Sequence, residues 1–335
     1  MITKKGRYVK PFYLLKAPWL VWEAVIQHMD PLDIMPLVQC SKRMRSIVKS
    51  FTKRQHYRLH LKPTPNFVIS LKSIHSYDKF NFMFTEDLFH RCLGYKGVWN
   101  INRPIHLSDK VFLMKQLFYK LQSLYTLTFE LVEFDLNDWK NNDPSLVYNW
   151  LNTFGDKIQR ARIHSNCISG VGYQRFLENF HFSNYAILTV TCPDFDWLEG
   201  APLPLFHDHL RMKPANWVTE EYLLSLKNSV TVVLEEAAML TDENINSILH
   251  NLIRGSNPRL EYIKLGLDRN YDGWRILEGI EVYHEDSGRV FRRNRIEQFD
   301  EGGYYFQLDS GENATIFFYP DDVSIGVVIW RNENN

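Results

Sequence analysis

The stretch Pro11–Thr52 reads PFYLLKAPWLVWEAVIQHMDPLDIMPLVQCSKRMRSIVKSFT. Its proline, aspartate and serine residues include typical helix-start signals. Pro18 suits a first helical turn, because the N–H that it lacks would have no intrahelical partner there. Asp30 is an N-cap followed by proline, and Ser41 is a further N-cap. These signals predict three short helices, over residues 19–29, 31–39 and 42–53.

The first of these helices is more apolar than a surface helix normally is. Only Glu23, Gln27 and His28 are clearly polar in it, whereas a surface helix usually has an apolar stripe of about 100°. A unit of about 40 residues has too much surface for its volume to bury so many apolar side chains. Leaving each large side chain exposed forgoes roughly 1.5–3 kcal/mol. We therefore expect a cover for this helix, either the downstream part of the chain or a partner protein.

The stretch resembles an F-box, the three-helix motif that docks substrate receptors onto a Skp-type adaptor in cullin–RING ubiquitin ligases. The family's opening Leu-Pro corresponds to Ala17-Pro18, and its acidic-Pro-x-acidic-aliphatic turn corresponds to 30–34. Its Leu-x-x-Cys-Ser/Lys segment corresponds to 37–42. The chain departs from the pattern at Ala17, where Leu is usual, and at Met44, where many F-boxes have Trp. The Met-Asp-Pro and Cys-Ser-Lys combination is similar to the divergent F-boxes of nematodes.

The F-box resemblance also implies which residues contact the adaptor. They are Leu14, Leu15, Pro18, Trp19, Leu20, Val21, Val25, Met29, Pro31, Leu32, Ile34, Leu37 and Cys40. The resemblance further implies a non-catalytic receptor subunit of an SCF-type ubiquitin ligase. Its partners would be a Skp-type adaptor, through it a cullin and a RING protein, and an unknown protein substrate that is sent to proteasomal degradation.

Charge and composition narrow the classes of partner. The chain has 335 residues, 45% of them hydrophobic, and a formal net charge of zero, which gives no global reason to expect a nucleic acid or a membrane. The first 62 residues, however, hold 13 Lys and Arg against three acids. Such a basic segment either only contacts solvent, or binds an acidic protein partner, or binds nucleic acid. A nucleic-acid binder would use Tyr8, Phe12, Tyr13 and Tyr57 to stack on bases. Skp-type adaptors are acidic, so the resemblance favours the protein partner.

The sequence predicts a protein of a reducing, intracellular compartment, in the cytoplasm, the nucleus or both. Its cysteines are scattered, with no C-x-x-C pair, at Cys40, Cys92, Cys167 and Cys192. The N-terminus has no apolar segment of the signal-peptide type. No stretch approaches 18 apolar residues without charge, which is the length that spans a bilayer.

Downstream of a linker with two early strands, over 66–71 and 79–84, the chain repeats a strand, a turn and a helix. A short helix over 86–93 and a longer one from Ser108 or Asp109 precede the repeats. Strands are predicted over 126–129, 159–163, 186–191, 210–213, 229–234 and 260–265. Helices are predicted over 145–152, 173–180, 220–226 and 242–254. This rhythm is typical of leucine-rich repeats, although the asparagine ladder is missing.

A second resemblance lies at Lys213–Leu265. This segment is similar to the core of the F-box-associated domain of the second type, found behind nematode F-boxes. The similarity rests on Trp217, the Leu-Thr-Asp at 240–242 and the Asn-Pro-x-Leu-Glu-Tyr at 257–262. Each of these also has a structural explanation, for example Thr241 as an N-cap and Gly255 as a C-cap. The two resemblances cover 11–52 and about 110–285.

The C-terminal region predicts four further strands in a small antiparallel sheet. They lie over 290–299, 303–311, 314–320 and 324–330, with turns at Gly302-Gly303, Asp309–Gly311 and Pro320-Asp321. Their apolar residues are expected to close the end of the repeats, so that burial is predicted for Tyr305, Ile316, Phe318, Val327 and Ile329. The predicted fold is therefore mixed α/β, with an F-box at 11–55, a linker and early strands at 56–108, an irregular leucine-rich-repeat-like domain at 109–285 and a β-rich extension at 286–331.

Catalytic and metal-binding patterns are weak in this sequence. His207-Asp208-His209 offers two imidazoles without a third ligand, and Asp194-Phe195-Asp196 stands in a predicted loop. No P-loop, dinucleotide fingerprint, zincin or nucleophile-elbow motif occurs. We therefore predict no cofactor, no metal and no enzymatic activity. The alternative functions are an interaction protein that occupies the adaptor without causing degradation, and the nucleic-acid binder.

Overall fold

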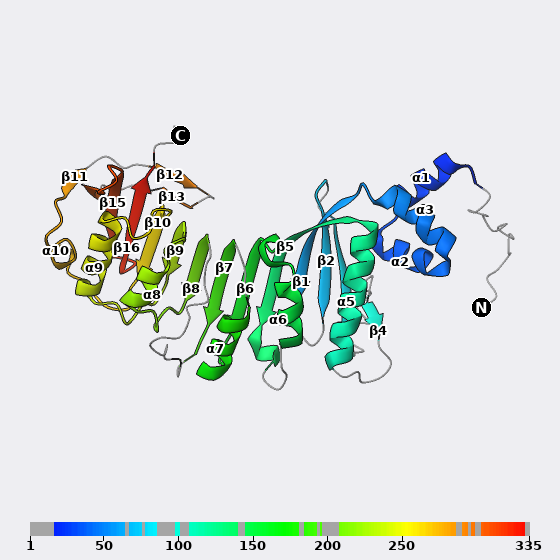
Figure 1. Ribbon diagram of the computed structural model, residues 1–335, viewed down its shortest axis with the longest axis horizontal. Coiled ribbons are helices and arrows are strands. Elements are labelled where there is room, and N and C mark those ends of the chain that lie inside the picture. The colour runs from blue at the N-terminus through cyan, green and yellow to red at the C-terminus, as the bar shows by residue number, and fades with distance from the viewer. Residues whose placement is uncertain are drawn as a thin grey trace, which may run out of the picture. The chain divides into compact units, whose positions relative to one another are not determined.

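The computed structural model describes residues 17–63, 67–75, 78–85, 98–100, 107–139, 145–180, 184–192, 195, 208–285, 290–293, 296–298 and 303–331. The chain divides into two compact units, which are described separately. Unit 1 comprises Met1–Leu59, Val68–Ile105 and Phe112–Thr128. Unit 2 comprises His60–Phe67, His106–Val111 and Phe129–Asn335. Figure 1 labels the helices and strands of both.

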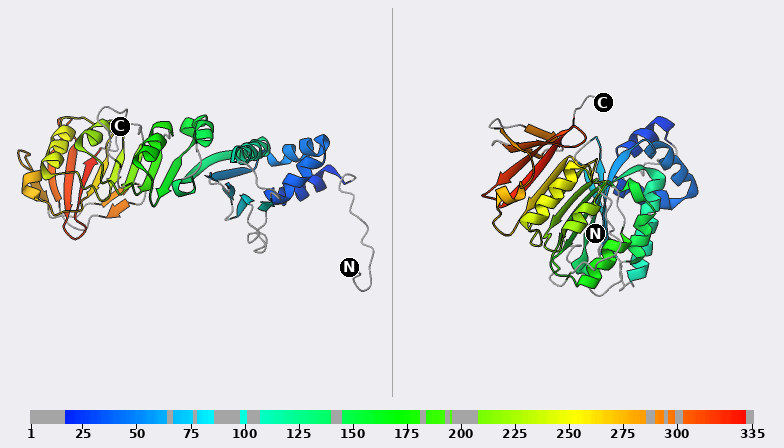
Figure 2. Two further views of the ribbon diagram at one scale, coloured as in Figure 1. Left: turned by 90° about the horizontal axis from the view of Figure 1, so that it is seen from below. Right: turned by 60° about the vertical axis from the view of Figure 1, so that its left-hand side comes forward.

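Unit 1 begins with three short helices that form one group (Figure 2). They are α1 (Trp19–Gln27), α2 (Pro31–Cys40) and α3 (Lys42–Thr52). Pro18 is the N-cap of α1 rather than its first residue. Asp30 stands at the N-cap position of α2 with proline at N1 as predicted, but its side chain makes no cap hydrogen bond. The Ser41 hydroxyl accepts a hydrogen bond from the Met44 backbone N–H at 3.1 Å, so the predicted cap of α3 is also confirmed.

The three helices share an apolar core. The buried residues from them are Trp22, Ile26, Ile34, Met35, Val38, Met44, Val48 and Phe51. The end of α3 is tied to α5 (Leu107–Leu124) by the Thr52 hydroxyl, which donates to the Leu124 carbonyl at 2.9 Å. The Thr126 backbone N–H also donates to the Gln55 carbonyl, at 3.1 Å. These two hydrogen bonds, of which that of Thr52 is buried, fix the helices to the rest of unit 1.

The early strands of unit 1 form an antiparallel pair followed by a parallel neighbour. β2 (Val68–Ser73) pairs with β3 (Lys79–Thr85), and β3 pairs in parallel with β4 (Val98–Asn100). Phe82 is fully buried opposite Ile69, and Phe80 is half-buried. The predicted helix over 86–93 and the side chain of Phe84 lie outside what the structure describes. β1 (His56–Lys62) runs from unit 1 into unit 2.

Unit 2 is built on parallel strands, each paired with the next one along the chain. They are β5 (Thr126–Asp135), β6 (Arg160–Ser165), β7 (Tyr185–Val190), β8 (His209–Lys213), β9 (Thr231–Leu234) and β10 (Tyr262–Gly266). The predicted strands are all present, but β5 continues to Asp135 instead of ending at Phe129.

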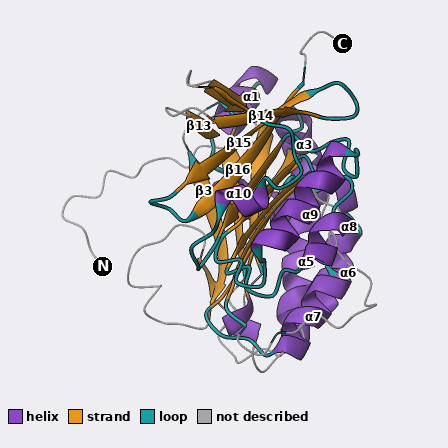
Figure 3. Cartoon of the chain, turned by 90° about the vertical axis from the view of Figure 1, so that its left-hand side faces the viewer, coloured by secondary structure: helices purple, strands orange, loops and turns teal. Residues whose placement is uncertain are grey.

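Helices cover one face of this sheet (Figure 3). They are α6 (Ser145–Asn152), α7 (Gly170–Asn179), α8 (Glu220–Ser225) and α9 (Asp242–Ile253), with short 3-10 helices at Leu136–Trp139 and Gly155–Lys157. Thr241 and Asn244 form a capping box at the start of α9, and Gly255 follows the C-cap of this helix with φ +81°, a conformation that favours glycine. No described helix combines the length and the apolarity needed to span a lipid bilayer.

The core of unit 2 lies between the sheet and these helices. Phe134 of β5 contacts Tyr148 of α6 and Phe180, the C-cap of α7, with ring centroids 5.7 and 4.9 Å apart. Trp217 packs edge-on against Tyr222 at 5.0 Å. Edge-to-face pairs of this kind add about 0.5–1.5 kcal/mol beyond the area that they bury. The aromatic content of the sequence is therefore used mainly for packing.

The C-terminal strands extend the same sheet instead of forming a separate small one. β14 (Gly303–Gln307), β15 (Asn313–Tyr319) and β16 (Ser324–Trp330) are antiparallel neighbours, and β16 pairs with β10. β11 (Tyr283–Glu285) pairs with β14, and α10 (Gly273–Ile276) precedes it. Without β16, the last parallel strand β10 would have unpaired backbone N–H and C=O groups along one edge. β16 pairs with these groups and so ends the parallel array.

Two details of the C-terminal prediction are wrong. The predicted strand over 290–299 is two short strands, β12 (Val290–Arg293) and β13 (Ile296–Gln298), which pair only with each other among the described residues. Tyr305 and Phe318 are half-buried, whereas their chain neighbours Phe306 and Phe317 are buried. The predicted burial of Ile316, Val327 and Ile329 is confirmed.

Candidate docking surface

Helix α1 divides sharply into a buried and an exposed side. Ile26 is 0% exposed and Trp22 is 5% exposed, so these two side chains anchor α1 on the other helices. Leu20, in contrast, is 75% exposed, Trp19 56% and Val21 37%. The Trp19 ring packs against Phe51 of α3, with ring centroids 4.5 Å apart. The described part of the chain therefore leaves the apolar face of α1 open.

The residues predicted to bind the adaptor fall into four groups. Leu14 and Leu15 lie outside the described residues. Pro18, Trp19, Leu20, Val21 and Cys40 are exposed. Val25, Met29, Leu32 and Leu37 are half-buried. Pro31 and Ile34 are buried, so their side chains are positioned to support the helices from within.

Helix α3 and its C-cap residue carry exposed basic side chains. The exposed ones are Lys42, Arg43, Arg45, Lys49 and Lys53. Within the described residues none of the five has an ion pair. Unpaired surface cations of one sign favour the approach of an acidic partner, and they act mainly on the association rate. The exposed apolar face of α1 and the cations of α3 lie on adjacent helices of one group, and together they are termed the docking surface.

Tyr57 does not fit the nucleic-acid alternative. Its ring is only 8% exposed and packs edge-on against Tyr125, with centroids 5.0 Å apart. Burial, with a smaller contribution from Asp30 and Asp78, raises the pKa of Tyr57 to about 12. A base cannot stack on a buried ring, so this member of the proposed stacking set is excluded. Tyr8, Phe12 and Tyr13 lie outside the described residues.

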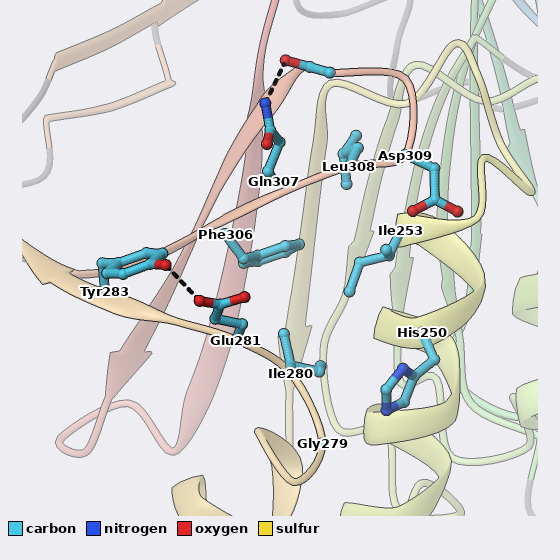
Figure 4. Close-up of a pocket in the computed structure, with 11 residues that line it drawn as sticks. His250, Ile253, Gly279, Ile280, Glu281, Tyr283, Phe306, Gln307, Leu308 and Asp309 are labelled. Carbon is cyan, nitrogen blue, oxygen red and sulfur yellow. Dashed lines mark hydrogen bonds between the residues drawn. The ribbon is translucent and has the colours of Figure 1, made fainter.

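Unit 2 holds a half-open pocket of about 550 Å³ beside α9 (Figure 4). Ile253, Ile280 and Phe306 form its apolar wall, whereas Glu281 and Asp309 bring carboxylates to it. These segments are far apart in the sequence, so no sequence pattern could have predicted the pocket.

The polar groups of the pocket are partly engaged. The Tyr283 hydroxyl donates to Glu281 at 2.5 Å, and this bond raises the pKa of Tyr283. His250 Nε2 lies 3.2 Å from the Glu278 carbonyl. The described lining includes no serine, threonine, cysteine or lysine that could act as a nucleophile. The lining is thus partly apolar and partly acidic, and the Tyr283 hydroxyl is already bonded to Glu281.

The weak metal patterns of the sequence have structural explanations where they are described. Asp208 forms an ion pair with Arg259 at 2.7 Å, and the ring of His209 lies 5.7 Å from that of Tyr185. His207, Asp194 and Asp196 are outside the described residues. No group of three or more metal-ligating side chains occurs in the part of the chain that the structure describes.

Two family models match this chain. The F-box domain matches residues 18–56, which contain α1, α2 and α3. A family described as F-box associated matches residues 202–265, which contain β8, α8, β9, α9 and all of β10 except its last residue. A search of curated proteins finds no match. The chain therefore carries an F-box domain in unit 1 and an F-box associated region in unit 2.

Proposed function

We infer that the protein is a substrate-recognition subunit of an SCF-type ubiquitin ligase. The observation that carries this proposal is the exposed apolar face of α1, at Trp19, Leu20 and Val21, inside a matched F-box domain. Three large apolar side chains on one short helix are the kind of patch that a partner covers. Burying them supplies roughly 1.5–3 kcal/mol each. The occupant that the F-box match favours is a Skp-type adaptor, and through it a cullin and a RING protein.

The role of unit 2 in this proposal is to hold the target. Its consecutive parallel strands with helices on one face support the interpretation as a leucine-rich-repeat-like array. Such an array offers a broad, rigid surface made by many strands. The mechanism is effective concentration: a tethered target meets the ubiquitin-charged enzyme in an almost intramolecular reaction. The receptor itself performs no chemistry and acts inside the cell, where the ligase is present.

Target turnover tests this proposal against the non-degradative alternative. Proteins bound to the full chain are identified by affinity purification with and without proteasome inhibition, and their half-lives are measured after depletion of the chain. A receptor predicts partners that accumulate on proteasome inhibition and live longer after depletion. Partners whose half-lives do not change would indicate an interaction protein that only occupies the adaptor.

A further inference from the structure

The sheet face opposite the helices carries a patterned set of charges on β6, β7 and β8. Along these strands the alternate side chains, such as Ile163, Leu188 and Met212, are at most 1% exposed. The strand register places them on the same face as Phe134, which contacts α6 and α7. The other side chains face away from the helices and are accessible. Those of β6 and β8 are Arg160, Arg162 and His164, and His209, Arg211 and Lys213. Both outer strands of the three therefore present a column of basic and imidazole side chains.

The central strand differs from its neighbours. The outward side chains of β7 are Tyr185, Ile187 and Thr189, which are uncharged and half-buried. The register places Ile187 between Arg162 and Arg211, and the same pairing repeats one step along in each direction. The surface is thus a neutral strip with a basic column on each side, and it is termed the β7 strip.

Carboxylates flank this surface from outside. Glu235 follows β9 and contacts Arg211 at 2.9 Å and Lys213 at 3.1 Å. Partial burial acts to raise the pKa of Glu235, but the hydrogen bonds and charges of Arg211 and Lys213 together outweigh it, so the pKa is lowered. None of the outward side chains of β6, β7 or β8 is acidic. The flanking carboxylates hold the cations in place and leave the β7 strip without negative charge.

The β6 column is the less neutralised of the two. The Arg160 guanidinium lies over the Tyr185 ring, 5.9 Å from its centroid. Arg162 lies 3.9 Å from Glu133, a carboxylate that also faces the Lys62 amine at 3.2 Å and His60 at 3.6 Å. These groups, His60 first, outweigh the partial burial of Glu133 and hold its pKa at about 2. Glu133 is therefore ionised, and it is shared between several cations.

The spacing of the cations selects the kind of ligand. Neighbouring strands lie about 4.8 Å apart, so the two columns are about 9.6 Å apart, too far for one phosphate to contact both. Successive outward residues on a strand are about 6.7 Å apart, and alternate residues of an extended peptide have the same repeat. A peptide lying along β7 can therefore direct successive carboxylates to β6 and β8 in turn.

We propose that the β7 strip binds an extended, acidic segment of a protein target, with its backbone over Ile187 and its carboxylates against the Arg160–Arg162 and Arg211–Lys213 columns. This proposal rests on the inferred receptor role, because it specifies the chemistry of the target that the receptor would bind. The binding is electrostatic and exposed to solvent. It is expected to weaken as salt shortens the Debye length from about 14 Å to about 6 Å.

Fluorescence anisotropy of a labelled peptide with about six alternating Asp and Glu residues tests the site. The protein is the full chain, prepared with its adaptor when the two co-purify. Arg160→Glu with Arg162→Glu is expected to weaken binding at least tenfold, and Arg160→Gln with Arg162→Gln is expected to weaken it less. Arg175→Glu with Arg254→Glu is the matched control, since it reverses two exposed charges on the helical layer, one on α7 and one at the C-cap of α9. The control is expected to bind like the wild type.

Several outcomes would overturn the assignment. One is equal binding by the wild type and the Arg160→Gln, Arg162→Gln variant, with thermal melting unchanged. Another is no preference for the acidic peptide over its Asn/Gln counterpart. A third is a single-stranded RNA of similar length that binds more tightly than the acidic peptide and loses its binding in the same variants. The ligand of the β7 strip would then be nucleic acid instead of a peptide. Adaptor binding is measured on each preparation. A chain that binds the peptide but not the adaptor would refute the receptor role alone. A chain that binds the adaptor but not the peptide would refute the β7 strip alone.

Discussion

A chain carrying Leu20→Asp and Val21→Asp is expected to lose at least 100-fold in affinity for a Skp-type adaptor, about 2.7 kcal/mol. Both side chains are already exposed, so the substitutions should leave the helices folded. In a covered interface, however, each aspartate would be buried without a partner, which is more costly than the loss of the apolar contact alone. Co-purification followed by titration calorimetry measures the effect.

The matched control for this prediction is Val171→Asp. Val171 is 64% exposed on α7, outside the F-box match, and its replacement adds the same kind of charge to a helix. This variant should bind the adaptor as the wild type does. If the Leu20→Asp, Val21→Asp chain melts normally and still binds the adaptor at full strength, the assignment of the docking surface to α1 is wrong.

Removal of residues 286–335 is expected to destabilise unit 2 as a whole. The deletion takes away β16, whose Ile325, Val327, Val328 and Ile329 are all at most 4% exposed. Burying four such side chains contributes roughly 6–12 kcal/mol, which is comparable with the 5–15 kcal/mol stability of a typical protein. The deletion also leaves β10 with an unpaired edge. We expect aggregation, or fast hydrogen exchange throughout β8, β9 and β10.

Deletion of residues 332–335 alone is the control for the truncation, and it should leave exchange in β8–β10 unchanged. Full protection of these three strands in the longer truncation would contradict the prediction. The C-terminal strands would then be an independent appendage instead of the end of the array.

Local signals account for the parts of the fold that the sequence predicts well. The N-caps Asp30, Ser41 and Thr241 place three helix starts, and α6 was predicted with its observed bounds. Alternating apolar residues locate β6 to β10 to within two residues at each end. These elements are well predicted because each one depends on its own residues.

Features that depend on distant residues are predicted less well. The sequence predicts that β5 ends at Phe129, but the strand extends to Asp135. It continues because the Glu133 carboxylate is paired with Lys62, a residue on another strand. The pocket beside α9 is likewise not predicted, because its lining residues come from segments that are far apart in the sequence. Apolar composition indicates that α1 has an open face, but only the packing shows that Ile34, one of the predicted adaptor contacts, lies inside the helical group.

The most direct test of the central claim is the mass of the chain by size-exclusion chromatography with light scattering, alone and co-expressed with a Skp-type adaptor. Alone, the chain should aggregate, because Trp19, Leu20 and Val21 are uncovered. Co-expressed, it should elute as a single complex whose mass is 39.8 kDa plus that of one adaptor. A monodisperse monomer of 39.8 kDa that remains apart from the adaptor would contradict the account.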